Sequence, residues 1–238
     1  MRGYRATIVA LMLAATCGMA LAHETPAITT TRTNGGLIEP FAIGGVDLTF
    51  PVPRAYCLPT GRYETIAKVA AQMDARNLTV VSFVSCADME KGIEQTRWGM
   101  LKALIATVGG GAGPRQDLIN TLKAQINPAD LQELNKKGAE EVKGNIEHGL
   151  GQKIDIAVDI KTLDADDVAA YSGGTLTFKK AVGDPIPISC VYAVTVAKDR
   201  VFFLYFFSVK TGAHEITTLL SELKLATQAF VSANPENK

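Results

Sequence analysis

Apolar residues dominate two adjacent segments near the end of the chain, 186–196 and 201–209, which are joined by the polar stretch Ala197-Lys198-Asp199-Arg200. Two apolar runs around a short polar turn predict a β-hairpin, and therefore an antiparallel sheet. Both alternating sets of side chains in the second run are apolar, so both faces of the sheet must be covered, and helices on both faces are the economical cover. The pattern therefore predicts an α+β fold, a three-layer α/β/α sandwich around a largely antiparallel sheet. The two sets are Val201, Phe203, Tyr205, Phe207 and Val209, and Phe202, Leu204 and Phe206.

A covering helix is expected directly after this hairpin, because apolar residues recur there at helical spacing. Thr211 or Thr217 could cap its start, and Asn234-Pro235 should stop it. The stripe comprises Ile216, Leu219, Leu220, Leu223, Thr227 and Phe230.

A second helix is indicated over 61–76, with Asn77 as its left-handed end, and it leads into a strand over 78–85. The apolar stripe of this helix consists of Tyr63, Ile66, Ala70 and Met73.

The middle of the chain predicts further strands and helices. Apolar and polar residues alternate strictly over 153–161, which is typical of a strand at the edge or open side of a sheet. Residues 175–179 form the next expected strand, entered through Gly173-Gly174. Helices are favoured between 117 and 148, with Pro128 starting a second piece. The segment 98–108 suits a helix or a strand covered on both faces, and we favour the strand.

The first 22 residues have the features of a secretory signal peptide. Arg2 and Arg5 precede a short apolar run, and small residues before His23 predict cleavage between Ala22 and His23. The run is too short to span a bilayer, and the residues before Cys17 make a poor lipoprotein processing site, so we expect no integral membrane segment after processing. The mature protein should be periplasmic or secreted.

Removal of the signal leaves 216 residues, which suffice for one large domain or two small ones. Polar, turn-rich residues over 23–36 predict a flexible leader. The remainder contains no repeat and no linker, so we expect a single α+β domain over 37–235.

Three cysteines follow the signal, and export permits disulfides. Cys57 ends a strand-like segment over 46–56, and Cys86 ends the expected strand 78–85, so both lie where the backbone can adjust to the bond. Cys190 lies inside an apolar strand, where a free thiol behaves as a small hydrophobe. We therefore predict a Cys57–Cys86 disulfide and a free Cys190.

The order of elements over 173–234 resembles the end of the Mog1/PsbP-like fold, an antiparallel sheet sandwiched by helices. The similarity lies in a polar strand, the hairpin turned at Ala197-Lys198-Asp199-Arg200, the aromatic strand 202–207 and the final helix ending at Ser232-Ala233-Asn234. Upstream, Leu48-Thr49-Phe50-Pro51-Val52-Pro53 with Tyr56-Cys57 is similar to the opening of small exported bacterial proteins of that fold without an assigned activity. The resemblance implies architecture and not chemistry, because the fold serves unrelated binding roles.

Charge excludes one class of partner. The chain has 24 basic and 24 acidic residues, and loss of Arg2 and Arg5 with the signal leaves a net charge of minus two. Nucleic acid and anionic lipid would want clustered Lys and Arg, so we expect no nucleic-acid partner.

Three groups of residues contain part of a known binding motif, but none contains the complete motif. The glycine run 109–113 could cradle a phosphate, but it lacks the Gly-Lys-Ser/Thr ending of a P-loop. Asp164, Asp166 and Asp167 could offer oxygen ligands to calcium, but the EF-hand pattern is incomplete. His23, His148 and His214 make no zinc motif, although His23 could bind copper as the new amino terminus. We therefore expect no metal and no cofactor.

Catalysis has equally little support, because a pairing of Cys190 with His148 or His214 would have no accompanying Cys or Ser motif. We expect no catalytic residues. The sequence favours a non-enzymatic binding or accessory module with a protein or small-ligand partner. Two alternatives remain: a carrier of a small apolar ligand, held between the sheet and the 117–148 helices or along the aromatic strand, and a small hydrolase with an unusual site.

Overall fold

The computed structural model describes residues 31–33, 36–72, 74, 76–125, 128–150, 154–180 and 183–236. It combines helices with antiparallel sheets, which confirms the α+β class. The predicted signal peptide, with Cys17, Ala22 and His23, lies outside the described residues.

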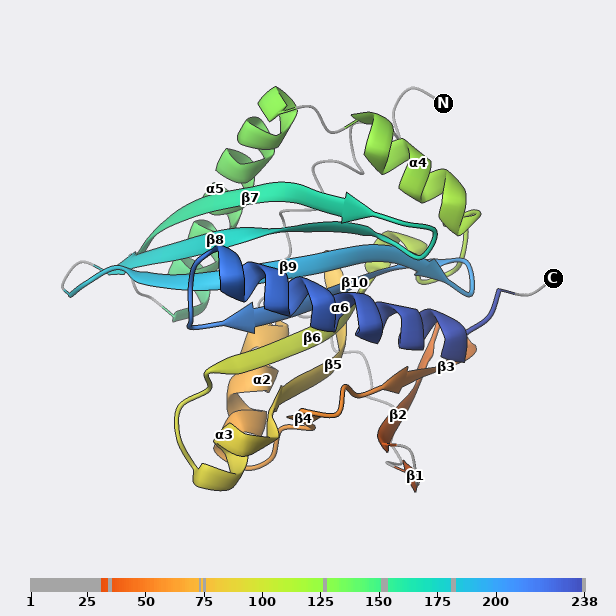
Figure 1. Ribbon diagram of the computed structural model, residues 1–238, viewed down its shortest axis with the longest axis horizontal. Helices are drawn as coiled ribbons and strands as arrows, with labels where there is room; N and C mark the ends of the chain where they lie inside the picture. The colour runs from red at the N-terminus through yellow and green to blue at the C-terminus, as the bar shows by residue number, and fades with distance from the viewer. Residues whose placement is uncertain are drawn as a thin grey trace.

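The main sheet has seven strands in the order β4-β5-β6-β10-β9-β8-β7, and every neighbouring pair is antiparallel (Figure 1). The predicted hairpin is confirmed at its centre, where Lys198 and Asp199 form the turn with positive φ angles of 48° and 62°. The strands of the main sheet are β4 (Tyr56–Cys57), β5 (Asn77–Ser85), β6 (Arg97–Leu104), β7 (Ile154–Ala165), β8 (Ala170–Lys180), β9 (Ile186–Ala197) and β10 (Arg200–Ser208).

A smaller sheet, which the sequence did not predict, contains β1 (Thr31–Thr33), β2 (Gly36–Ile43) and β3 (Val46–Pro51). Of the leader expected over 23–36, the described residues are in strands β1 and β2. The expectation of one strand-like segment over 46–56 is wrong, because the chain leaves β3 at Pro51 and turns at 54–55 before it joins the main sheet as β4. Proline has no amide hydrogen for a ladder, so Pro51 and Pro53 favour this break.

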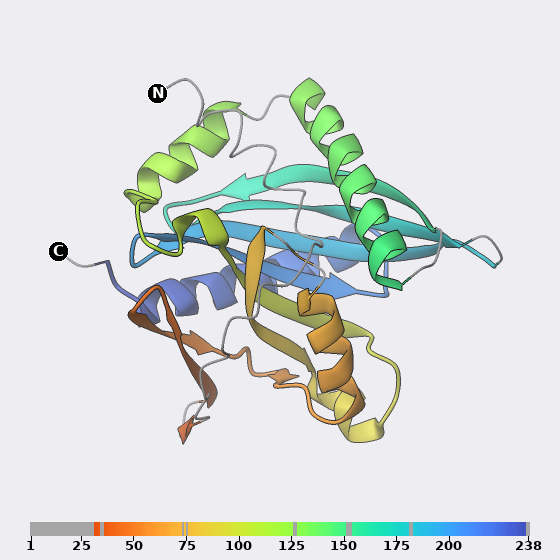
Figure 2. The same cartoon turned by 180° about the vertical axis from the view of Figure 1, so that it is seen from behind.

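Helices cover the two faces of the main sheet differently. The long helix α6 (Ala213–Ala233) lies on one side, whereas α2 (Arg62–Gln72), α4 (Arg115–Gln125) and α5 (Pro128–Leu150) lie on the other (Figures 1 and 2). The short α3 (Cys86–Lys91) and the 3-10 helix η1 (Ile105–Thr107) complete the set. We call the two sides the α6 face and the α2/α4 face.

Strand β10 contributes to a separate core on each face, as its double alternation predicts. On the α6 face, Phe202, Leu204 and Phe206 pack with Leu219, Leu223 and Phe230 of α6 and with Phe50 of β3. On the α2/α4 face, Val201, Phe203 and Tyr205 pack with Tyr192 of β9 and with Leu118 and Leu122 of α4.

Two strands have different bounds in the structure from those that the sequence predicts. The favoured strand at 98–108 is confirmed for 98–104, and Ile105–Thr107 is a 3-10 helix. The expected strand 175–179 begins earlier, at Ala170, so Gly173 and Gly174 lie inside β8 and do not lead into it. A Cβ atom at Gly174 would lie 1.8 Å from the carbonyl oxygen of Asp159 on β7, which explains why the strand needs glycine there.

The helix ends differ more from the pattern. Helix α2 stops at Gln72 and Asn77 is the first residue of β5, so Asn77 is not the terminator. Tyr63 is buried, but Ile66 is 52% exposed, which contradicts the expected buried stripe, and Met73 lies outside the described residues. Helix α6 starts after Gly212 without a side-chain cap, so neither Thr211 nor Thr217 caps it, whereas its end before Asn234 is confirmed.

Helix α5 protects the predicted edge strand β7. The Asn135 side-chain amide donates to the carbonyl oxygen of Ile160 at 3.0 Å, and Lys143 pairs with Asp155 at 2.7 Å. An uncovered edge would offer its backbone groups to another chain. The helices expected over 117–148 are therefore present, begin at Arg115 and Pro128, and serve in part to guard this edge.

Candidate functional site

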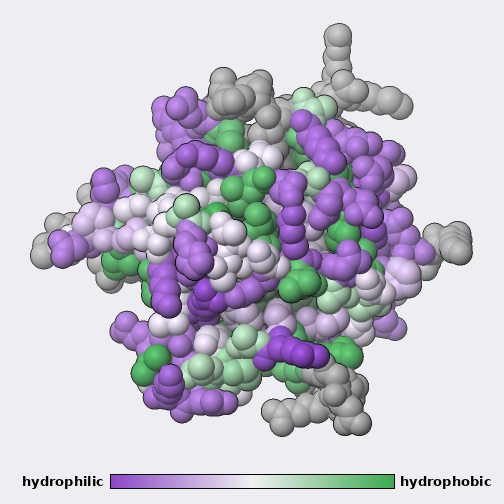
Figure 3. Space-filling model, viewed as in Figure 1, coloured by the Kyte–Doolittle hydropathy of each residue, from purple (hydrophilic) through white to green (hydrophobic). Residues whose placement is uncertain are grey.

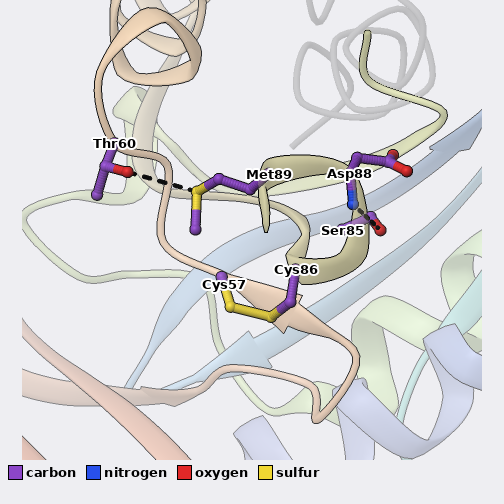
Figure 4. Close-up of a disulfide and its surroundings, with 6 residues drawn as sticks. All are labelled: Cys57, Thr60, Ser85, Cys86, Asp88 and Met89. Atoms are coloured by element: carbon purple, nitrogen blue, oxygen red, sulfur yellow. Dashed lines mark hydrogen bonds between the residues drawn. A yellow bond between two sulfur atoms is a disulfide. The ribbon is translucent and has the colours of Figure 1, made fainter. Parts of the chain in front are cut away.

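The predicted disulfide is present between Cys57 of β4 and Cys86, the first residue of α3, with Cα atoms 5.0 Å apart (Figure 4). Next to it, the Ser85 hydroxyl accepts a hydrogen bond from the Asp88 amide and so caps α3. The Thr60 hydroxyl contacts Met89 Sδ at 3.5 Å. The Cys57–Cys86 disulfide therefore fixes the short helix α3 to the end of the sheet.

Cys190 is a free, buried thiol, as predicted, on the α2/α4 face of β9. Burial raises the pKa of this thiol far above its usual range, which makes it a poor nucleophile. His214 is the second residue of α6, and the main sheet lies between that helix and Cys190. His148 is in α5, at a position whose side chain is outside the described part of the chain. The structure does not bring Cys190 and His214 together.

The glycine run 109–113 does bind a carboxylate, but one of its own chain. The amides of Gly111 and Gly113 donate to the two carboxylate oxygens of Asp199 at 2.6 and 2.8 Å. These hydrogen bonds hold the pKa of Asp199 below its usual range. Amides occupied in this way are not available to a phosphate, so the loop fastens the β9–β10 turn.

Two of the three aspartates considered as calcium ligands are likewise engaged within the protein, whereas Asp167 is exposed. Asp166 accepts hydrogen bonds from the amides of Val168 and Ala169 and from the Tyr171 hydroxyl, and Asp164 pairs with Lys224. Among the described residues no group of three His, Cys, Asp or Glu side chains is arranged to hold a metal ion. The calcium hypothesis gains no support from this turn.

Aromatic rings instead form a stack along the α2/α4 face. Trp98 of β6 stacks on Phe207 of β10 with ring centroids 5.3 Å apart, and Phe207 stacks on Tyr205 at 5.9 Å. Tyr205 in turn stacks on Phe203 at 6.3 Å. We call these four residues the aromatic strip. Cross-strand register places Trp98 opposite Phe207, so the strip follows from the pairing of β6 with β10.

The aromatic strip is open at one end and closed at the other. Trp98 and Phe207 are partly exposed, whereas Tyr205 and Phe203 are buried. Beyond the open end, the strands of the same face carry further partly buried apolar side chains, including Leu176 and Ile188. Ile186, at the start of β9, is 43% exposed. By contrast, apolar residues on the α6 side are scattered among polar ones (Figure 3).

A polar group adjoins the closed end of the aromatic strip. Lys102 and Asp74 form an ion pair at 2.6 Å, with side chains 3% and 0% exposed. The Lys102 ammonium lies 5.8 Å from the centroid of the Tyr205 ring. No described residue forms a hydrogen bond with the Tyr205 hydroxyl, although that oxygen is buried.

The sequence predicted the aromatic strand but not this polar neighbour. Lys102 interrupts the apolar run of β6, and a charged residue at a covered strand position is a signal that a partner is needed. The partner itself carries no local signal, because Asp74 lies 28 residues earlier, just after α2.

In comparisons with known proteins, no family model and no curated protein matches this chain. Within the described ranges, none of the helices combines the length and the apolar character needed to cross a membrane.

Proposed function

We propose that this protein acts after export as a non-enzymatic binding module of the bacterial cell envelope, and that it binds a small apolar molecule at the open end of the aromatic strip. The observation that carries the proposal is the stacked pair Trp98–Phe207, which is partly exposed on a sheet face rather than sealed in the core. Contiguous exposed apolar surface on a globular protein marks an interaction site.

The cover of this face supports the same function. Helix α4 packs over β8 and β9, α5 over β7, and α2 beside β5, so the helices flank the strands that carry Trp98 and Phe207 (Figure 2). Together with α6 we infer a three-layer α/β/α sandwich, in keeping with the resemblance to the Mog1/PsbP-like fold. Sites between a sheet and its covering helices suit small ligands, because apolar walls exclude water.

Export is supported by two independent features. The amino-terminal sequence predicts a signal peptide, and the Cys57–Cys86 disulfide suits an oxidising compartment such as the periplasm. A hydrolase is the weaker alternative, since the candidate nucleophile Cys190 is buried with a raised pKa and is separated by the sheet from the helix of His214.

Binding of toluene to the mature protein tests the proposal. Trp98 is the single tryptophan, so its fluorescence reports directly on the strip. We expect toluene to change this fluorescence saturably, Phe207→Ser to abolish the change, and Leu225→Ser to preserve it, because Leu225 is 75% exposed on α6. Native mass spectrometry of protein from the periplasm should show a mass excess that denaturation removes. Failure of toluene to bind the folded wild-type protein would contradict the proposal.

A further inference from the structure

The Tyr205 hydroxyl is an unusual group for the interior of a protein. The residue is 5% exposed, and no described residue forms a hydrogen bond with its oxygen. A buried hydroxyl without a partner destabilises a fold by about 1–3 kcal/mol, and the large majority of buried polar groups are paired. The neighbouring Tyr192 differs, because burial raises the pKa of its hydroxyl but the Ser172 side chain opposite it on β8 acts to lower that pKa. Tyr205 therefore has a hydrogen-bonding capacity that the described fold does not use.

The charges around Tyr205 indicate which net charge a ligand bonded to its hydroxyl would have. Lys102 and Asp74 neutralise each other beside the ring, and both are almost fully buried. A ligand with a net charge would add an unpaired ion to a region of low dielectric constant, which is strongly unfavourable. Charge complementarity therefore favours a neutral ligand.

The geometry of the aromatic strip indicates the ligand's shape. Phe207 and Tyr205 are nearly parallel, with an interplanar angle of 7° and a centroid separation of 5.9 Å. The partly exposed Phe207 ring is thus next to the ring that carries the buried hydroxyl. A flat ring can lie against such a stack and make offset contacts with it.

We propose that the site takes a neutral, ring-bearing molecule with one hydroxyl or carbonyl oxygen, and that the Tyr205 hydroxyl anchors this oxygen by a hydrogen bond. The inference rests on the proposed function, because it names the ligand class for the same strip. Tyr205 donates to a carbonyl oxygen, and it donates to or accepts from a hydroxyl.

Three small probes of matched shape test the anchor: toluene, which has no polar atom, p-cresol, which adds a neutral hydroxyl, and p-toluate, which adds a negative charge. Each is titrated against the mature protein, with the fluorescence of Trp98 excited beyond the absorption of the probes. We expect p-cresol to bind about threefold to tenfold more tightly than toluene, as one net hydrogen bond implies. We expect p-toluate to bind more weakly than p-cresol.

The variant Tyr205→Phe should reduce p-cresol affinity to that of toluene and leave toluene affinity unchanged. It removes a hydroxyl that has no described partner, so it should not lower the midpoint of thermal unfolding. Tyr192→Phe is the matched control, because it removes the hydroxyl of a neighbouring buried tyrosine that faces Ser172 of β8. This control should keep the preference for p-cresol.

The outcomes separate the two proposals. Equal binding of toluene and p-cresol, or equal effects of Tyr205→Phe and Tyr192→Phe, would overturn the anchor while toluene binding upholds the binding function. Tighter binding of p-toluate than of p-cresol would overturn the assignment of a neutral ligand. If toluene does not bind the folded protein, the binding function itself fails.

Discussion

The ammonium nitrogen of Lys102 lies 2.6 Å from Oδ2 of Asp74, and neither side chain is more than 3% exposed. Asp74 also accepts hydrogen bonds from the amides of Arg76 and Asn77 and from the Asn77 side chain. The carboxylate thus joins the end of α2 to strands β5 and β6. A buried pair of this kind fixes one arrangement of its elements, since either charge alone would be buried without compensation.

Removing one member of this pair should destabilise the protein strongly. Lys102→Met and Asp74→Asn should each lower the free energy of unfolding by about 3–5 kcal/mol in urea titrations. The double variant should be more stable than the sum of the single effects predicts, because it leaves no isolated charge. Lys137→Met, which removes the exposed pair with Glu133, should leave stability nearly unchanged. Additive single effects would show that the two charges are not coupled.

The disulfide should contribute through the loop that it closes. Cys57 and Cys86 are 29 residues apart, for which the chain-entropy model gives about 3–4 kcal/mol. The variant Cys57→Ser/Cys86→Ser should lose that much stability. Cys190→Ala should retain the disulfide in non-reducing peptide maps. Detection of a peptide that joins Cys190 to another cysteine in the wild type would contradict the assigned pairing.

Asp199 should control the order of the glycine loop. Asp199→Asn removes the charge that the amides of Gly111 and Gly113 bind, so these amides should exchange faster with deuterium. Because the pKa of Asp199 is lowered in the folded state, the protection should persist above the unfolded pKa of about 3.9 and be lost as the pH falls through the folded value. Asp167→Asn, at an exposed position in another turn, should leave exchange in the loop unchanged. Unaltered exchange in Asp199→Asn would contradict the assigned role of the carboxylate.

Sequence periodicity was sufficient to predict an element and its buried faces where the pattern within that element alone shows which side chains are covered. The double alternation of β10 predicts two covered faces, and the stripe in α6 predicts a helix on one of them, because these patterns are long and dense. The same reasoning predicted the disulfide, since both cysteines lie at strand ends.

Periodicity failed where the environment depends on distant partners. The stripe in α2 predicts burial of Ile66, but the helix packs mainly through Tyr63, whose hydroxyl donates to backbone carbonyls of Asp88 and Ile93. The smaller sheet was missed because prolines interrupt its strand pattern. The candidate site was only half predicted, since the aromatic strand is visible in the sequence whereas Asp74 and the unpaired Tyr205 hydroxyl depend on tertiary packing.

Arg97 holds together a second charged network, beside the α6 face. Its guanidinium contacts Glu215 at 2.7 Å and Glu222 at 2.8 Å, and the Tyr56 hydroxyl donates to the other oxygen of Glu222 at 3.0 Å. A planar guanidinium can bridge two carboxylates, whereas a lysine ammonium offers a single point charge. Arg97→Ala should therefore lower the free energy of unfolding by about 2–3 kcal/mol at neutral pH, and Arg97→Lys by less.

The pH dependence of the stability lost in Arg97→Ala tests whether that loss is electrostatic. Burial acts to raise the pKa of Glu215, but hydrogen bonds from Ser208 and Arg97 outweigh it, so the pKa lies below the usual range. A lowered folded pKa contributes stability above the unfolded value of about 4.3, and this contribution disappears as the pH falls through the folded value. The difference in the free energy of unfolding between wild type and Arg97→Ala should thus be largest at pH 7 and should decrease below about pH 4. Arg54→Ala, which removes an exposed arginine, should show no such trend in urea titrations across this range. If the deficit of Arg97→Ala is constant from pH 7 to pH 3, the side chain acts by packing rather than by charge.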